Sequence, residues 1–282
     1  MGNALIDKEL IGEPRLYDLA MRLEAETLHV LLYRSGEPES IVYRAVPLDA
    51  PGLPPERRLE ETVYNNPLLL SDFHKVTILV DTTRYAIIPD NATGGDTLFA
   101  EVLADRMLPD TADDSRAETL FTPMSPEGVT VAVKMQSQLL AFLRRTFNNP
   151  AIYPPIAPLS RYFYDSSRIG HSGKIYVNIR RDSLDLLAFT GSRLELANTF
   201  AFRESADAIY YIMSVRKMLM DRDGDDRELL IAGDDALRDE TTAVLREYAG
   251  YVMPVVYPAT LVRAPKDVLK APFDLIITPQ CE

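Results

Sequence analysis

Apolar and polar residues alternate along the first part of the chain, over residues 16–48. Two short polar segments interrupt the alternation, Glu24-Ala25-Glu26 and Ser35-Gly36-Glu37. A period of two residues is typical of a β-strand that buries one face, and short polar segments are typical of the turns between strands. The pattern therefore predicts three consecutive antiparallel strands.

A helix and a buried strand are expected next. Prolines at positions 51, 54 and 55 favour the start of a helix, because proline suits a first turn, and we expect this helix to run through Glu61 to about Asn65. The segment KVTILVD at 75–81 is a continuous run with several β-branched residues. Such a run predicts a central strand that is buried on both faces.

Five further segments complete the first half. Hydrophobic periodicity and turn residues predict a strand at 85–88, a helix at about 96–107, an acidic loop at 110–115, a strand at 128–133 and a helix at 136–147. Four prolines then follow at positions 150, 154, 155 and 158, and proline-rich segments are typical of linkers between domains. We therefore expect two domains, at residues 1–157 and 158–282.

The second half repeats this order. Alternation over residues 174–202 predicts three more antiparallel strands. Ser205 is expected to cap the next helix, and strands at 228–234 and 252–257 are expected on either side of a helix at 236–248. The final PFDLIITPQCE predicts an apolar strand or a packing tail. The duplication predicts an α/β protein with two tandem domains, each a mixed sheet with a three-strand antiparallel meander flanked by helices.

Composition limits the partners and the compartment. The 282 residues carry a formal net charge of -12, and such a field repels nucleic acid and anionic lipid. Cys281 is the single cysteine, so an intramolecular disulfide is impossible and a reducing compartment is favoured. Since no apolar segment approaches the length of a membrane span, we expect a cytoplasmic protein without membrane insertion.

The duplicated order of meander, helix, strand and helix resembles the actin-like ATPase superfamily, whose domains have the ribonuclease H-like fold. Three segments, YDLAMRLEAETLHVLLY at 17–33, FLRRTF at 142–147 and the terminal Cys281-Glu282, resemble an uncharacterised bacterial family of that superfamily, the domain of unknown function 3822. The resemblance covers nearly the whole chain and implies two tandem actin-like lobes.

The segments that hold nucleotide in active members of the superfamily are degenerate in this chain. Active members place an aspartate and a glycine in the first hairpin of each lobe, where they order the metal-bound water and let backbone amides approach phosphates. The matching stretch at 21–26 has neither residue, and the second hairpin has Asn178 at the acid position and no glycine. The glycine pair of the adenosine motif is reduced to Gly233. The resemblance therefore implies a fold that has lost ATP hydrolysis.

Other motifs for phosphate or metal binding are incomplete. The segment Gly170-His171-Ser172-Gly173-Lys174 has Arg168 where a phosphate loop needs its first glycine and Ile175 where it needs Ser or Thr. The aspartates at 221, 223 and 225 have calcium-loop spacing without its glycine and glutamate. We therefore expect a linker, a solvated loop, no metal and no catalytic residues.

Three hypotheses on function remain open. The first is a non-catalytic actin-like scaffold that needs no cofactor and binds a protein partner or itself. The alternative is a nucleotide-binding or phosphotransfer protein that holds ATP in the interlobe cleft through Asn178, Arg180, Arg181 and Gly233, because an arginine pair at a hairpin tip can bind phosphate. The third is a sensor that binds a small molecule in the same cleft.

Overall fold

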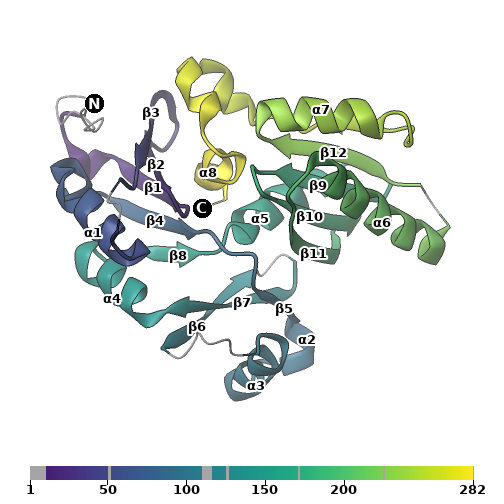
Figure 1. Ribbon diagram of the computed structural model, residues 1–282, viewed down its shortest axis with the longest axis horizontal. Helices are drawn as coiled ribbons and strands as arrows, with labels where there is room; N and C mark the ends of the chain where they lie inside the picture. The colour runs from purple at the N-terminus through teal and green to yellow at the C-terminus, as the bar shows by residue number, and fades with distance from the viewer. Residues whose placement is uncertain are drawn as a thin grey trace.

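The computed structural model describes residues 11–49, 52–109, 116–124, 127–170, 172–224 and 226–281. The acidic loop expected at 110–115 lies outside these ranges, as do His171 of the phosphate-loop candidate, residue 225 of the calcium-like segment and Glu282. Two five-stranded sheets and one smaller sheet form the framework of the described structure (Figure 1).

The first large sheet contains the predicted meander. Its strands β1, β2 and β3 pair antiparallel in sequence order. Strand β4 pairs parallel with β1, and β8 pairs parallel with β4, so the sheet order is β3-β2-β1-β4-β8. The bounds are β1 (Asp18–Leu23), β2 (Thr27–Arg34), β3 (Glu37–Pro47), β4 (Lys75–Val80) and β8 (Ala151–Tyr153). Two helices of this lobe are α1 (Pro55–Tyr64) and α4 (Ser137–Thr146), at the places where the sequence predicts helices.

The second large sheet has the same order, β11-β10-β9-β12-β13. Its elements are β9 (Lys174–Ile179), β10 (Ser183–Thr190), β11 (Arg193–Ala201), α6 (Ser205–Asp223), β12 (Glu228–Gly233), α7 (Asp235–Leu245) and β13 (Val252–Pro254). The duplicated arrangement predicted from the pattern is confirmed. One detail is wrong, since Glu204 caps α6 through a capping box with Asp207, and Ser205 is the first residue of the helix.

An additional unit is inserted between β4 and β8. It contains a three-stranded sheet of order β5-β7-β6 and two helices at one end of the molecule (Figure 1). Its elements are β5 (Ala86–Pro89), α2 (Asp90–Thr93), α3 (Thr97–Met107), β6 (Ala117–Met124) and β7 (Val129–Gln136). The sequence pattern does not predict β6, because AETLFTPM contains a proline and no regular alternation.

The elements stack in layers. Helices α1 and α4 cover the outer face of the first large sheet, and α6 and α7 cover the outer face of the second (Figure 1). Helix α5 (Ile156–Ser167) and the C-terminal segment lie between the two sheets and share one apolar core with both of them. Helix α5 spans the predicted boundary at residue 157, and the two domain limits stay a prediction.

The C-terminal segment is helical. It forms the short helices η5 (Ala259–Arg263), η6 (Lys266–Lys270), α8 (Phe273–Ile277) and η7 (Thr278–Gln280). All five residues of α8 are buried. Of the two alternatives expected for the chain end, the apolar strand is wrong and the packing tail is confirmed. Pro272 favours a helix start at Phe273. The segment is enclosed between two sheets, and a helical turn provides hydrogen bonds for part of its backbone N–H and C=O groups.

Candidate functional site

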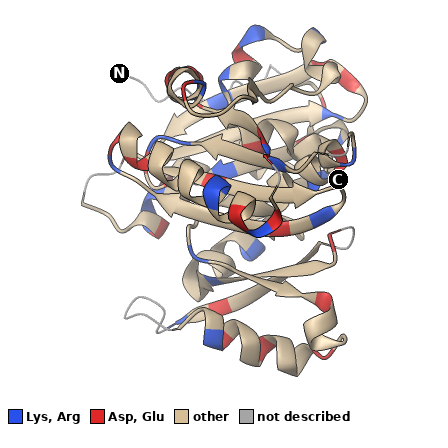
Figure 2. Ribbon diagram, turned by 90° about the vertical axis from the view of Figure 1, so that its right-hand side faces the viewer, with Lys and Arg blue, Asp and Glu red and all other residues tan. Residues whose placement is uncertain are grey.

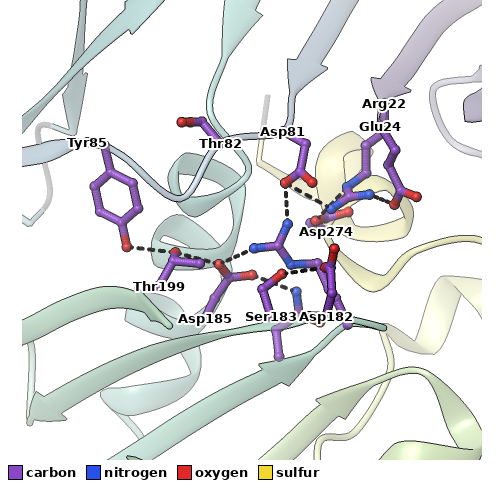
Figure 3. Close-up of polar contacts among 12 residues, drawn as sticks. Arg22, Glu24, Asp81, Thr82, Tyr85, Asp182, Ser183, Asp185, Thr199 and Asp274 are labelled. Carbon is purple, nitrogen blue, oxygen red and sulfur yellow. Dashed lines mark hydrogen bonds and ion pairs between the residues drawn. The ribbon is translucent and has the colours of Figure 1, made fainter. Parts of the chain in front are cut away.

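The β1–β2 hairpin of the first lobe and the β9–β10 hairpin of the second approach each other between the lobes (Figure 3). They are alike in the two halves, because Glu24 N–H donates to Thr27 O at 3.0 Å and Arg180 N–H donates to Ser183 O at 2.8 Å. Arg22 of β1 pairs with a residue of β4, and Asn178 of β9 pairs with a residue of β12. Each of the two stands one position before the end of its strand. Arg22 in the first lobe and Asn178 in the second therefore hold equivalent positions in the duplicated fold.

Strand alternation turns Arg22 toward the space between the lobes. Leu19 and Met21 pack into the core of the first lobe, whereas Ala20 belongs to the core shared by both lobes. Arg22 follows Ala20 by two residues and so has the same orientation. Its side chain is fully buried, and its Nε donates to Asp274 Oδ2 of α8 at 2.8 Å.

The Arg22 guanidinium is surrounded by carboxylates (Figure 3). It also forms an ion pair with Glu24 and lies 3.5 Å from Asp81 Oδ1 at the end of β4. Asp274 is fully buried, and burial raises the pKa of its carboxyl, although the guanidiniums of Arg22 and Arg180 act in the opposite direction. A buried guanidinium and a buried carboxylate in direct contact each limit the desolvation cost of the other.

Arg180 joins the two lobes. Its guanidinium forms an ion pair with Asp81 of the first lobe and with Asp185 Oδ1 on β10 at 3.0 Å. Asp185 is itself buried and accepts hydrogen bonds from Asn178 Nδ2 at 3.0 Å and from the Thr199 hydroxyl at 2.7 Å. Burial favours the neutral form of Arg180, but the nearby carboxylates, Asp185 first, outweigh burial and raise its pKa. Arg180 therefore stays charged in this network.

A neutral contact lies beside this ion-pair network. The Tyr85 hydroxyl of the first lobe lies 3.1 Å from the Thr199 hydroxyl on β11 (Figure 3). Burial and the charge of Asp185 raise the pKa of Tyr85 well above its usual value. The phenol therefore stays protonated, and Tyr85 is a second tie between the lobes.

His29 occupies the first-lobe side of the same region. Its Nδ1 lies 2.8 Å from the Tyr43 hydroxyl, and its Nε2 lies 3.4 Å from Glu24 Oε2. Burial and the neighbouring Arg22 charge lower the pKa of His29 to about 4, although Asp274 acts in the opposite direction. The imidazole is therefore neutral at neutral pH.

The four residues expected to bind a nucleotide, Asn178, Arg180, Arg181 and Gly233, line one cavity of about 460 Å³. The tertiary structure brings them together, but two of them already have protein partners. Asn178 and Arg180 both bind Asp185, whereas Arg181 is exposed at the hairpin tip.

Gly233 has a structural role at the end of β12. Its φ is +108°, and a Cβ added there would lie 1.9 Å from the carbonyl oxygen of Ile179. Asp234 follows, and its carboxylate accepts the N–H groups of Ala236 and Leu237, both at 3.1 Å, at the start of α7. The glycine therefore permits close contact between two strand ends, and Asp234 already occupies two free N–H groups of the helix.

The sequence pattern does not identify the carboxylates of the network or its buried arginine as members of a site. Arg22, Asp81, Asp185 and Asp274 come from β1, the end of β4, β10 and α8. The available signal was a charged residue within an otherwise apolar run, as in LAMRL and PFDLII, because such a residue is costly to bury without a partner. The signal marks the residue but does not identify its partner.

The other candidate motifs are structural in the described residues. Lys174 is the first residue of β9 and its Nζ donates to the Ile169 carbonyl, while Ser172 Oγ donates to Glu228 Oε1 at 2.8 Å. Within the described ranges, no group of three or more His, Cys, Asp or Glu side chains is placed to hold a metal ion.

No helix in the described part of the chain has the length and apolar character needed to cross a membrane.

Two solved structures are similar to this chain over nearly its whole length. A protein with actin-like ATPase fold and unknown function from Bacteroides thetaiotaomicron VPI-5482 is 20% identical, with 95% of this chain and 97% of that chain covered and a TM-score of 0.77. The PilM–PilN type IV pilus biogenesis complex provides a chain that is 13% identical, with 95% and 98% covered and a TM-score of 0.55. The predicted fold of two tandem actin-like lobes is confirmed.

Similarity in sequence leads to a family whose function is unknown. No curated protein matches the sequence of this chain. The model of one protein family, described as protein of unknown function (DUF3822), matches residues 8–252. This chain therefore belongs to the DUF3822 family, which is the family that its sequence resembles.

Proposed function

We propose that this protein is a non-catalytic, actin-like scaffold that binds a protein partner. The observation that carries the proposal is the ion-pair network between the lobes. Arg22 and Arg180, the two guanidiniums beside the hairpins of the two lobes, already bind the protein's own carboxylates. The carboxylates of the network therefore already pair with the positive charges that a phosphate group would bind.

The charge balance of the network also disfavours a nucleotide. Two guanidiniums, of Arg22 and Arg180, are surrounded by four carboxylates, of Glu24, Asp81, Asp185 and Asp274. A triphosphate would enter a region with more acids than bases and would be repelled. To bind Arg22, it would also have to separate a buried ion pair, and removing one partner of such a pair costs about 3–5 kcal/mol.

Protein binding is supported by exposed apolar surfaces. Helix α3 exposes several large apolar side chains, and a second apolar surface lies between α6 and α7. Contiguous exposed apolar surface on a water-soluble domain is typical of a protein interface. The fold also occurs in a protein complex, because a structural neighbour was solved as PilM–PilN.

The nucleotide alternative is favoured by one observation, the cavity of about 460 Å³ beside Gly233. Arg181 and Lys270 both line this cavity and are largely exposed. These cations are the groups in the cavity least engaged by buried carboxylates, although Lys270 forms an exposed ion pair with Asp267 at 3.0 Å.

Calorimetric titration with Mg-ATP and with Mg-ADP distinguishes the two hypotheses. The scaffold proposal expects no heat of binding and no phosphate release. Micromolar binding that Arg181→Ala or Lys270→Ala abolishes would contradict it and support the alternative. Gly233→Ala is not a suitable variant, because the added Cβ collides with Ile179 and disturbs the fold whether or not a nucleotide binds.

A further inference from the structure

A cavity of about 310 Å³ lies on the inner face of the first large sheet. Thr77 and Leu79 of β4 line it, whereas Ile78 between them packs into the core on the outer face. Helix α5, the end of β6 and the C-terminal segment complete the lining. We call it the β4–α5 cavity. Among the described residues, it shares none with the cavity beside Gly233 or with the ion-pair network between the lobes.

The lining of the β4–α5 cavity is mainly apolar. Leu79, Met124, Ala157 and Pro158 are buried side chains that line it, and they come from β4, β6 and α5. Small-molecule sites have volumes of about 300–1,000 Å³, are lined largely by apolar side chains and often lie where structural units meet. This cavity lies where the first large sheet meets the inserted unit, and its volume is near the lower end of that range. Its size and lining therefore suit a compact organic molecule.

Two hydroxyl groups of the lining have no polar partner in the described part of the chain. Thr122 is only 7% exposed and lines the cavity, but its hydroxyl forms no hydrogen bond with a described residue. The same holds for the hydroxyl of Tyr153, which is partly buried. A hydroxyl that leaves water without gaining a hydrogen bond costs free energy, and such groups are uncommon in folded proteins. Each of these hydroxyls can donate to a bound molecule or accept from it.

The charges at the cavity balance one another. Lys75 and Arg161 are the cations of the lining, and Glu127 is its acid. A second carboxylate, that of Asp165, lies 3.5 Å from Arg161. Figure 2 likewise shows basic and acidic residues interspersed along the ribbon, without a large region of one sign. Two cations matched by two carboxylates favour neither an anion nor a cation, and an uncharged molecule also avoids the cost of removing an ion from water.

We infer that the β4–α5 cavity binds a small uncharged organic molecule with an apolar body and at least one hydroxyl or amide group. The body contacts the buried apolar side chains of β4, β6 and α5. The polar group exchanges hydrogen bonds with the hydroxyls of Thr122 and Tyr153. This site goes beyond the proposed function, because it lies apart from the interlobe network and from the apolar surfaces that support partner binding.

Cys281 is a natural reporter for this site. It is the single cysteine of the chain, it lines the cavity and it is partly exposed. Alkylation of a thiol depends on the access of the reagent to the sulfur. A molecule bound in the cavity should therefore slow the alkylation of Cys281 by iodoacetamide. The mass of the intact protein follows this reaction, since one thiol gives one product.

Four compounds of similar size and different charge serve as probes on the full chain. Benzyl alcohol and benzamide are uncharged, benzoate is an anion and benzylamine is a cation at neutral pH. We expect benzyl alcohol or benzamide to slow alkylation about twofold when its concentration equals its Kd, because half of the protein is then occupied. Benzoate and benzylamine should protect Cys281 less at the same concentration.

A matched pair of variants tests the hydroxyl. Thr122→Val keeps the shape of the side chain and removes its hydroxyl, so the protecting compound should bind about threefold to tenfold more weakly. Thr242→Val is the control, because Thr242 of α7 is also 7% exposed, has a hydroxyl without a partner among the described residues and lies outside the cavity. Thermal melting verifies the fold of each variant. Tyr153→Phe replaces Thr122→Val if the latter melts earlier than the wild type.

Three outcomes would overturn the inference. They are no protection of Cys281 by either uncharged compound up to its solubility, equal protection by the charged compounds, and equal binding to Thr122→Val and Thr242→Val. None of these outcomes bears on the scaffold proposal, which the calorimetric titration with nucleotides tests separately.

Discussion

At the scale of single residues, the region between the lobes is defined by side chains that neutralise one another. Arg22 and Asp274 are both fully buried and in direct contact, although 252 positions separate them along the chain. Asp81 contacts Arg22 and Arg180 together and so connects the two arginines. The arginines beside the two hairpins therefore contact carboxylates of the protein itself.

Replacing Asp274 by asparagine is expected to destabilise the protein. The substitution keeps the shape of the side chain and removes the buried carboxylate that accepts from Arg22 Nε, while Glu24 and Asp81 stay beside the guanidinium. The free energy of unfolding should therefore fall by about 3 kcal/mol, the lower end of the range for a broken buried pair. Asp267→Asn is the matched control, because Asp267 pairs with Lys270 at the surface with both side chains at least 70% exposed, and such pairs contribute at most about 1 kcal/mol. Urea unfolding measures both, and equal losses would contradict the prediction.

His29 predicts a dependence of stability on pH. Its pKa is lowered from 6.5 to about 4 in the folded protein, so between these values the unfolded chain binds a proton that the folded chain does not. The contribution of His29 is complete above pH 6.5 and is lost as the pH falls toward 4, and its size is about 3 kcal/mol. Unfolding free energy measured across this range should fall less steeply in His29→Gln than in the wild type. Equal slopes would contradict the prediction.

At the scale of elements, α8 closes the space between the sheets. Its residues belong to the core shared by both lobes, together with residues of α5, β1, β2, β9 and β10. Asp274 projects from the same short helix to Arg22. One five-residue helix therefore supplies both apolar packing and the buried carboxylate.

Phe273 is the residue of α8 whose packing is most directly testable. It is 2% exposed, and its ring lies 5.9 Å from that of Phe163 and 5.4 Å from that of Tyr257, between ring centroids. Phe273→Ala should lower the free energy of unfolding by about 3–5 kcal/mol, because it removes a buried aromatic ring and leaves a cavity. Leu269→Ala, in the same segment but at a 44% exposed residue, is the control and should have a much smaller effect. Similar effects of the two would show that α8 does not stabilise the shared core.

At the scale of the whole molecule, the two lobes are joined by apolar packing and by polar ties. Layers of helices cover the outer faces of the two sheets, and α5 and α8 fill the space between them (Figure 1). The ion pair of Arg180 with Asp81 and the contact of Tyr85 with Thr199 cross the same space. Domains that share a core in this way are expected to be coupled in stability.

The shared core predicts a single unfolding transition for the whole chain. Opening one lobe alone would expose the residues that α5 and α8 bury against both sheets, so the lobes should unfold together. Scanning calorimetry is expected to show one peak, with a van't Hoff enthalpy close to the calorimetric enthalpy. Two resolved peaks would show that the lobes are independent.

Local pattern in the sequence was sufficient to predict most elements. Each large sheet begins with a meander of alternating apolar residues, and β4 and β12 are apolar runs, because burial on one or two faces imposes these patterns directly. The absence of glycine from both hairpins can also be read directly from the sequence, since residue type is a property of single positions. Strand β6 and the helical form of the C-terminal segment were not predictable in this way, because their local patterns are irregular and tertiary packing determines their conformation.

The sequence by itself determined the duplicated α/β framework and the family of this protein, and it shows that the hairpin stretches at 21–26 and 178–183 contain no glycine. Only the tertiary structure decided what occupies the space between the lobes. Arg22 meets Asp274, and Arg180 meets Asp81 from 99 positions away. A buried charge requires a partner, but the choice among the available carboxylates depends on which strand ends and helices the fold brings together, and that information is not local in the sequence.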